Sequence, residues 1–301
     1  MEVEYLWNWE RLDTRLSKQY DYSRNFFHHI LERKGILVNG AVKKKSYRLQ
    51  NGDKVFIDNL ERYLSPAMFE ESPFCEIPIV YEEEDYLVLN KPKGVLSHPN
   101  SIRDLKTPSV VWFLFHYFQD LPSYGNFIRA WLIHRLDKDT DGLMIIAKTE
   151  KGLKHFKNLF QEKSENTSIQ EKESVPLQKF YRAEVFATQK WEFFLQTIKG
   201  QLPYYIQETV KAKVPNFIPK MGITKIENFS EIKREKSWLR IKVFLQILTW
   251  RTHQIRYHLS EKGLPIVWDY LYGEESNELL QLTAYKIQYL NLNGEMKVIE
   301  I

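Results

Sequence analysis

The sequence predicts an α+β fold, in which a small N-terminal α/β module precedes a mixed, largely antiparallel sheet with flanking helices. The clearest observation is the alternation of apolar and other residues from Leu239 to Ile247, which is typical of a long strand with one buried face. A second is the spacing of four apolar residues between 153 and 160, which gives a helix one apolar face. The third is that short β-prone runs alternate with helical segments along much of the chain.

The first 60 residues predict the small module. Residues 11–19 favour a short helix, and a second helix is expected from an N-cap at Ser23 to a stop at Gly35. The β-prone run 36–38 leads into the turn signal Asn39-Gly40, and another turn at 52–53 precedes a strand at 54–57. Residues 61–75 mix charges with two Ser-Pro pairs and are expected to be a linker.

The remainder, residues 76–301, is expected to form the second domain. Strands are predicted at 77–81 and 86–90 around an acidic turn, and a buried strand at 143–147. The polar segment 161–176 is expected to be an exposed loop insertion. After the long strand, a helix over about 252–262 should end at Gly263.

Composition limits the class of protein. The 301 residues are 43% hydrophobic and 27% charged, which suits a globular chain with one large core and a small extra domain. The net charge of +4 permits an anionic partner without requiring one. The single cysteine, Cys75, excludes an internal disulfide framework, and no His/Cys cluster has metal-ligand spacing.

Two further features predict a cytoplasmic protein. The first ten residues have neither a basic n-region nor an apolar h-region, so we expect no signal peptide. The most apolar stretch, Val110–Phe118, is too short to cross a bilayer. We therefore expect no membrane partner. Separately, we expect the protein to be a monomer.

Basic residues crowd the N-terminal module. On charge alone, its run of three lysines is as compatible with a solvated face as with a binding surface. The module resembles an S4 RNA-binding domain in its Arg11-Leu12-Asp13, Ser23-Arg24, Val38-Asn39-Gly40 and Gly52-Asp53 segments. The resemblance implies that basic side chains here neutralise RNA phosphates. The candidate RNA-binding residues are Arg24, Arg33, Lys34, Lys43, Lys44 and Lys45.

Three segments of the second domain carry residues suited to chemistry. The first, at 91–94, reads Lys-Pro-Lys-Gly and by itself indicates only a turn. The second, at 134–143, packs charged residues into a turn before a buried strand, where side chains are rigidly placed. The third, at 251–259, sets arginines and histidines at the start of a helix, where free N–H groups attract anions. By itself each segment is also compatible with an ordinary charged turn or a solvated helix cap.

Together these segments resemble the RluA family of pseudouridine synthases. That family has a Lys-Pro-x-Gly turn, a His-Arg-Leu-Asp-x-x-Thr-x-Gly block, a Lys-x-Tyr strand and an Arg-Thr-His-Gln-Ile-Arg helix. All four occur here in the family's order, at residues 91–94, 134–142, 179–181 and 251–256. The resemblance implies an enzyme that isomerises uridine to pseudouridine in RNA. Large-subunit ribosomal RNA is the first expectation for its substrate, with tRNA as the alternative.

The resemblance also implies residue roles. Asp137 matches the catalytic carboxylate, Tyr181 the tyrosine that lies against the target base, and Arg256 the basic partner of the aspartate. Arg135 matches a residue that holds the site open once the uridine is extruded. Further candidates for substrate binding are His134, Arg251 and Gln254. The reaction breaks C1′–N1 and joins C1′ to C5 without redox change, so no metal or organic cofactor is expected. Asp137 acts either as a nucleophile or as a base at the sugar.

Four residues depart from the family pattern. Trp250 and Trp268 stand where glycine is usual, Asp141 where serine is frequent, and Thr283 where histidine is frequent. None removes a catalytic group, so they bear on the shape of the site. Each indole either fills a gap in the core or stacks on a nucleotide beside the target uridine.

Two other functions remain compatible with the sequence. One is a non-catalytic RNA-binding or ribosome-assembly protein on a synthase scaffold. The joint presence of Asp137, Tyr181 and Arg256 favours the enzyme over it. The other is an RNA-modifying transferase with a nucleotide-derived cofactor, but the chain has no glycine-rich loop to hold one.

Overall fold

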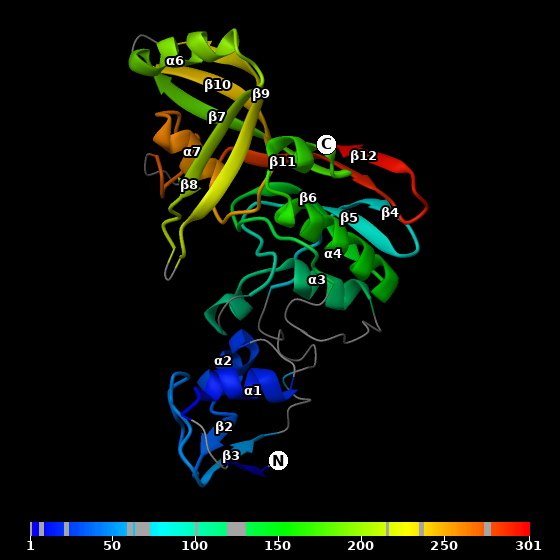
Figure 1. Cartoon of the computed structure of the whole chain (residues 1–301), viewed down its shortest axis with the longest axis vertical. Coiled ribbons are helices and arrows are strands. Elements are labelled where there is room, and N and C mark those ends of the chain that lie inside the picture. Colours follow the sequence, from blue (N-terminus) through cyan, green and yellow to red (C-terminus); the bar gives the residue numbers. More distant parts are fainter. Residues whose placement is uncertain are drawn as a thin grey trace. The chain divides into compact units, whose positions relative to one another are not determined.

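The computed structural model divides the chain into two compact units, one of Met1–Glu76 with Val95–Leu132 and one of Ile77–Gly94 with Ile133–Ile301 (Figure 1). It describes residues 2–5, 9–20, 24–58, 63, 73–99, 102–118, 131–214, 217–234, 238–273 and 278–301. Most of the predicted linker at 61–75 and the predicted N-cap Ser23 lie outside these residues. The assignment of 1–60, 61–75 and 76–301 as functional domains stays a prediction.

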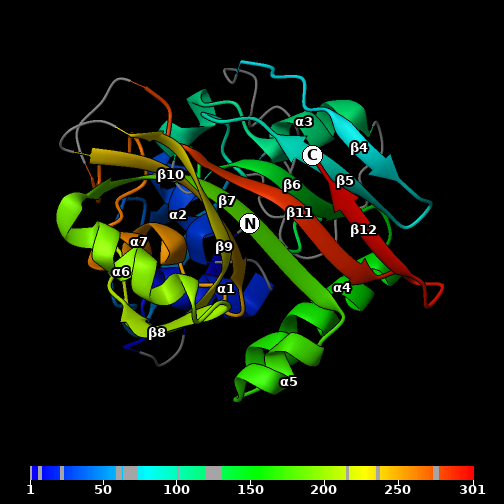
Figure 2. The same ribbon diagram turned by 90° about the horizontal axis from the view of Figure 1, so that it is seen from above.

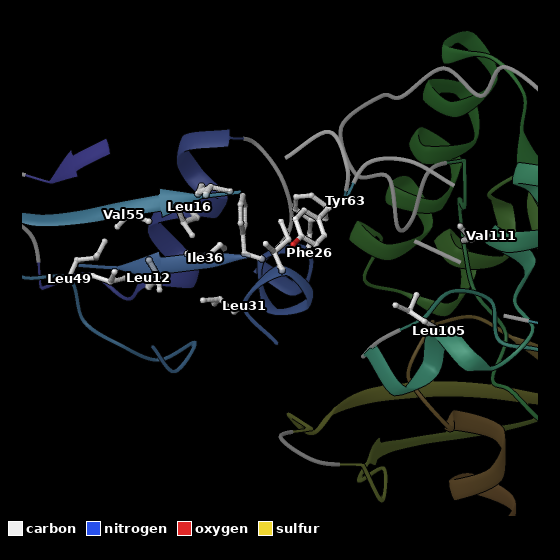
Figure 3. Packing of buried hydrophobic residues seen from close by; sticks show 14 of the residues in the cluster. Leu12, Leu16, Phe26, Leu31, Ile36, Leu49, Val55, Tyr63, Leu105 and Val111 are labelled. Atoms are coloured by element: carbon white, nitrogen blue, oxygen red, sulfur yellow. The ribbon is translucent and has the colours of Figure 1, made fainter. Parts of the chain in front are cut away.

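The N-terminal unit is a small α/β module. Its antiparallel sheet has the strand order β1-β3-β2. The strands are β1 (Glu2–Tyr5), β2 (Ile36–Val38) and β3 (Asp53–Ile57), and the helices are α1 (Leu12–Tyr20), α2 (Arg24–Glu32), the 3-10 helix η3 (Ile102–Lys106) and α3 (Val110–Tyr117). One buried apolar cluster takes residues from all of these helices and from β2 and β3; it includes Leu12, Phe26, Ile36, Val55, Leu105 and Val111 (Figure 3).

The predicted turn at Asn39-Gly40 closes the hairpin from β2. Both residues have positive φ, 53° and 74°, as a type I′ turn requires. Val38 and Ala41 exchange two backbone hydrogen bonds of 2.8 and 3.1 Å across it. The strand β1 was not predicted, because four residues that mix glutamate with apolar side chains are too short to give a clear period.

The second unit is built on a nine-stranded sheet with the order β4-β5-β6-β11-β7-β10-β9-β8, and β12 adds to β11 (Figure 2). Its strands are β4 (Ile79–Glu82), β5 (Tyr86–Lys91), β6 (Asp141–Ala147), β7 (Leu177–Thr188), β8 (Tyr204–Val210), β9 (Lys220–Arg234), β10 (Trp238–Ile247), β11 (Leu282–Leu290) and β12 (Met296–Glu300). Among these described strands, β6 and β11 pair in parallel and every other pair is antiparallel. The predicted α+β class with a largely antiparallel sheet is confirmed.

Four helices flank this sheet in the described part of the second unit. They are α4 (Glu150–Glu165), α5 (Ile169–Ser174), α6 (Gln189–Lys199) and α7 (Gln254–Glu261). Helix α4 packs on β6 and β7, α6 on β7 and β10, and α7 on β8 and β9. Tyr86, Ile145, Phe156 and Tyr289 are fully buried between α4 and the sheet. In the described part of the chain, no helix is long and apolar enough to cross a membrane.

The prediction of an exposed loop at 161–176 is wrong, because α4 continues to Glu165 and α5 begins at Ile169. Ser168 begins α5 with a capping box: its hydroxyl accepts from Glu171 N at 3.1 Å, and Glu171 accepts from Ser168 N at 2.9 Å. Lys163 and Lys172 are buried, and each donates to a backbone carbonyl, of Leu177 at 2.7 Å and of Lys163 at 2.8 Å. Lysine stems can cover apolar surface, so a polar composition concealed these helices.

Candidate active site

A cavity of about 370 Å³ lies in the second unit, lined by the segment before β6, by strand β7 and by the segment that leads into α7. All of the predicted catalytic and substrate-binding residues line it: His134, Arg135, Asp137, Tyr181, Arg251, Gln254 and Arg256. These residues come from three stretches that are far apart in the sequence, and the sheet brings them together. Their individual roles stay predictions.

The turn at 91–94 supports the segment that carries Asp137. Lys91 is fully buried, and its ammonium donates to the carbonyls of Pro92 at 2.8 Å and Lys138 at 3.1 Å. The backbone N–H of Gly94 donates to the same Lys138 carbonyl at 2.9 Å. In the sequence this segment by itself indicated only a turn. In the structure its hydrogen bonds to the Lys138 carbonyl hold the residue next to Asp137 in place.

Strand β6 begins directly after this segment and needs a glycine there. Gly142 has a φ of +117°, and a Cβ on it would lie 2.3 Å from the carbonyl oxygen of Ala284 in β11. In the adjacent pair, the Thr283 hydroxyl donates to Asp141 at 2.8 Å. Asp141 and Thr283 are two of the departures from the family pattern, and they are bonded to each other.

Strand β7 presents Lys179 and Tyr181 to the cavity, since they are two residues apart on the same face. Tyr181 is 5% exposed, and burial with the charge of Asp137 raises the pKa of its hydroxyl, which stays protonated. Burial lowers the pKa of Lys179 to about 7, and Asp137 opposes that shift only in part. The amine lies 5.6 Å from the centre of the Tyr181 ring.

His134 joins the Asp137 segment to two strands. Its Nε2 accepts a hydrogen bond from the backbone N–H of Ile145 at 2.9 Å, so the proton of the neutral ring is on Nδ1. Nδ1 lies 3.2 Å from the Lys179 amine. Two donors cannot share that contact, so Lys179 accepts as a neutral amine, which agrees with its lowered pKa. Both ring nitrogens of His134 are thus used within the protein.

Arg256 pairs with Asp269 and not with Asp137, the partner that the family resemblance implied. Its Nε and Nη2 donate to the two carboxylate oxygens of Asp269, at 2.8 and 2.7 Å, and both side chains are buried. Asp269 also accepts from the backbone N–H groups of Leu271 and Tyr272, at 3.1 and 3.2 Å. Burial would lower the pKa of Arg256, but Asp269 and then Asp137 raise it, so Asp137 still acts on it through space.

His253 was given no individual role from the sequence, although the histidines of its segment were expected to bind an anion or pair with a carboxylate. Its Nε2 lies 3.9 Å from Oδ2 of Asp137, and its Nδ1 lies 3.1 Å from the hydroxyl of Tyr272. It precedes α7 with a φ of 55°, a left-handed conformation that is uncommon outside glycine. Its place in the Arg-Thr-His-Gln-Ile-Arg block was the available signal. The backbone conformation that directs the ring cannot be seen in the sequence.

The other motif residues divide between scaffold and cavity wall. The Gln254 amide has several partners in the protein: it accepts from Thr249 at 2.6 Å and from Arg251 N at 3.2 Å, and it donates to Ile223 O and Thr224 at 3.0 Å each. Gln254 therefore holds α7 on β9 while lining the cavity, and its role in substrate binding stays a prediction. Arg251 donates from Nε to Met221 O at 2.9 Å while lining the cavity.

The two unusual tryptophans differ in position. The Trp250 ring lines the cavity, packs 5.1 Å from the Phe160 ring and has the Lys179 amine over it at 5.4 Å. It therefore belongs to both the core and the cavity wall. Trp268 is absent from the cavity lining and lies against the Arg240 guanidinium at 5.4 Å. Its φ of 61° is a conformation that favours glycine.

The candidate RNA-binding residues all lie in the N-terminal unit. Arg24, Arg33, Lys34, Lys44 and Lys45 are exposed and Lys43 is half-buried. Arg24 donates to the buried carboxylate of Asp13 at 2.9 Å, which also accepts from Arg11 at 3.0 Å. Burial would raise the pKa of Asp13, but these arginines and His28 hold it well below its usual range. Asp13 thus keeps the two arginines side by side.

Comparison with known proteins adds independent findings. The model of the RNA pseudouridylate synthase family matches residues 85–261. An uncharacterized RNA pseudouridine synthase from Aquifex aeolicus is 30% identical, over 97% of this chain and 90% of its own length. Ribosomal large subunit pseudouridine synthase D from Yersinia pestis is 30% identical, over 88% of this chain and 73% of its own. The solved structure of human RNA pseudouridylate synthase domain containing 1 has 21% identity and a TM-score of 0.52, covering 75% of this chain and 83% of its own, which is a likeness of fold.

Proposed function

Because the chain belongs to the RNA pseudouridylate synthase family and is an RNA pseudouridine synthase, we propose that it isomerises uridines in large-subunit ribosomal RNA with Asp137 as the reacting carboxylate and without a cofactor. The observation that carries the proposal is the cavity in which Asp137, Tyr181 and His253 converge. Asp137 is 24% exposed there, so a substrate can reach it.

The chemistry asks little more than a positioned carboxylate. Breaking C1′–N1 and joining C1′ to C5 of the same uracil imports no atom and changes no oxidation state. Asp137 acts on the sugar either as a nucleophile at C1′ or as a base. The turn at 91–94 and the His134 contacts support its segment on both sides, which is the rigid placement that catalysis requires.

Tyr181 is proposed to lie against the extruded base. A uridine in structured RNA must leave its stack to reach the cavity, at a cost of a few kcal/mol. The Tyr181 ring forms part of the cavity wall and stays protonated, so it offers a neutral stacking face. Base–aromatic stacking of about 1–3 kcal/mol offsets part of the extrusion cost.

Ribosomal RNA as the substrate is supported by the names of relatives, including ribosomal large subunit pseudouridine synthase C from Vibrio cholerae. The N-terminal unit is proposed to be an S4-like RNA-binding domain. Its support is the exposed basic set together with the pair Arg11 and Arg24 held by Asp13. Phosphate contacts of this kind position an RNA without reading its sequence.

The test compares Asp137→Asn with Asp139→Asn, a neighbouring carboxylate in the same turn. RNA labelled with tritium at uridine C5 loses the label to water only when pseudouridine forms. We expect no release by Asp137→Asn, unchanged RNA binding, and near wild-type release by Asp139→Asn. Release by Asp137→Asn within about tenfold of wild type would contradict the catalytic role. Release from tRNA but not from large-subunit ribosomal RNA would contradict the substrate while leaving Asp137 in its role.

A further inference from the structure

The hydroxyl of Tyr272 connects the backbone of one loop to the ring of His253. It accepts a hydrogen bond from the backbone N–H of Lys213 at 2.7 Å, and it lies 3.1 Å from Nδ1 of His253. On the other side of the imidazole, Nε2 faces Oδ2 of Asp137 at 3.9 Å. Three side chains therefore form a line that ends at the proposed reacting carboxylate.

The hydrogen positions along this line follow from its fixed donor. The N–H of Lys213 can only donate, so the Tyr272 oxygen accepts there and keeps its own hydrogen for another acceptor. Within the described residues the available acceptor is Nδ1 of His253. A neutral His253 then carries its proton on Nε2, directed at Asp137. The opposite tautomer would leave the tyrosine hydrogen without a protein acceptor among the described residues and set a nitrogen lone pair against a carboxylate.

Tyr272 is itself held by the buried ion pair. Its backbone N–H donates to Oδ1 of Asp269 at 3.2 Å, and the same oxygen accepts from Nη2 of Arg256 at 2.7 Å. Its ring lies 5.3 Å from the Arg256 guanidinium. The Arg256–Asp269 ion pair is therefore connected to Asp137 through Tyr272 and His253.

We propose that Tyr272 and His253 are positioning residues for Asp137: the tyrosine O–H fixes the His253 tautomer, and the Nε2–H of His253 is directed at the carboxylate. The inference rests on the proposed function, since it takes Asp137 as the reacting group. The separation of 3.9 Å is longer than a hydrogen bond. Catalytic contacts are often long in the free enzyme and shorten when substrate binds.

Burial favours this neutral form of His253, while the charges around it act in both directions. Asp137 and Arg135 face it from the segment before β6, Arg256 from α7, and Asp269 from the loop after α7. Burial lowers the pKa of His253, and the two carboxylates oppose that shift only in part. His253 is therefore neutral at pH 7 and above, where its tautomer decides whether a donor or a lone pair meets Asp137.

The first experiment measures the tautomer directly, without reference to activity. Nitrogen chemical shifts of the full-length protein with ¹⁵N-labelled histidine distinguish a protonated from an unprotonated ring nitrogen. His253→Asn assigns the signal, since asparagine tolerates the left-handed conformation. We expect Nε2 protonated and Nδ1 unprotonated in the wild type, with a shift towards the other tautomer in Tyr272→Phe. A wild-type ring with its single proton on Nδ1 would overturn the proposal, whatever the variants do.

The second experiment separates positioning from packing. Tyr272→Phe keeps the ring but removes the hydroxyl, and Tyr257→Phe is its matched control, since that ring packs edge-on against Tyr272 at 6.3 Å. We expect Tyr272→Phe to lower kcat by about tenfold or more at unchanged KM, and Tyr257→Phe to match the wild type. Equal kcat values for Tyr272→Phe and Tyr257→Phe would show that the Tyr272 hydroxyl does not position His253 and Asp137. If Asp137→Asn is inactive in the same assay, the proposed function survives that result; an active Asp137→Asn would remove the function but leave the tautomer measurement standing.

Discussion

The guanidinium of Arg256 lines the cavity, but its hydrogen bonds go to Asp269 and not to the proposed reacting carboxylate, Asp137. It is 3% exposed, and its Nε and Nη2 both donate to a fully buried carboxylate. A buried pair of this geometry is weak evidence of net stabilisation, but removing one partner leaves an uncompensated charge. Arg256 therefore links stability to the placement of Tyr272 and His253.

This predicts that Arg256→Ala destabilises the protein as well as inactivating it. The uncompensated charge of Asp269 should lower the free energy of unfolding by about 3–5 kcal/mol. Arg256→Lys should recover only part of the loss, because a lysine cannot form a planar fork. Urea unfolding of the variants measures this, with the exposed Arg135→Lys as the control. Wild-type stability in Arg256→Ala would show that the pair with Asp269 does not hold the fold.

At the scale of elements, strand β7 carries a buried lysine, Lys179, whose pKa is lowered. Lys179 is 3% exposed, and its amine contacts His134 Nδ1 at 3.2 Å and two aromatic rings. Its folded pKa of about 7 lies below the ordinary 10.5. Between these values the unfolded chain binds the extra proton and the folded chain does not, so stability rises as the pH rises from about 7 to 10.5 and falls as the pH is lowered.

The expected result is a slope that depends on this lysine. Lys179→Met should lower the rise in unfolding free energy by about 1.4 kcal/mol per pH unit in the middle of that window. Lys163, whose pKa burial also lowers to about 7, should keep a residual slope in that variant. Unfolding at a series of pH values gives the slopes, and Lys154→Met on the exposed face of α4 is the control. An identical slope in wild type and Lys179→Met would mean that Lys179 is protonated in the fold.

Elements with a single clear period could be predicted from the sequence, and elements of mixed character could not. Strand β10 was found because its apolar residues alternate, and α7 because Gly263, which has positive φ, follows shortly after its last residue. Helix α5 was missed because its buried group is a lysine, Lys172, which reads as solvent-exposed. Strand β9 was not identified because its register shifts against β10 at two places, which interrupts simple alternation.

At the site, the sequence could predict which motif residues come together, but it could not predict which side chains bond to each other. Every residue that the motif blocks predicted to be catalytic or substrate-binding lines the cavity. The motif blocks did not show that Arg256 binds Asp269, because that contact depends on how the loop after α7 folds back. Nor did they single out His253, whose direction is set by a left-handed backbone and by Tyr272.

At the scale of the whole molecule, the proposed RNA binding and the proposed catalysis belong to different units. The sheet of the second unit gathers segments from residues 91 to 272 around one carboxylate, whereas the exposed basic residues expected to grip RNA lie in the first. Affinity from phosphate contacts is electrostatic and falls with salt, whereas chemistry at the cavity depends on short-range geometry. The two contributions should therefore respond to different substitutions.

The last prediction tests that division in the full-length protein. Replacing Lys43, Lys44 and Lys45 by glutamine should weaken RNA binding and flatten the plot of log affinity against log salt by about one unit per lost phosphate contact. Turnover at saturating RNA should stay at the wild-type rate, because none of these residues lines the cavity. The matched control replaces three exposed lysines of α4, Lys151, Lys154 and Lys157, and removes the same charge from the second unit. An equal loss of slope in both triple variants would show a diffuse effect of net charge, and the N-terminal unit would then not be a dedicated RNA anchor.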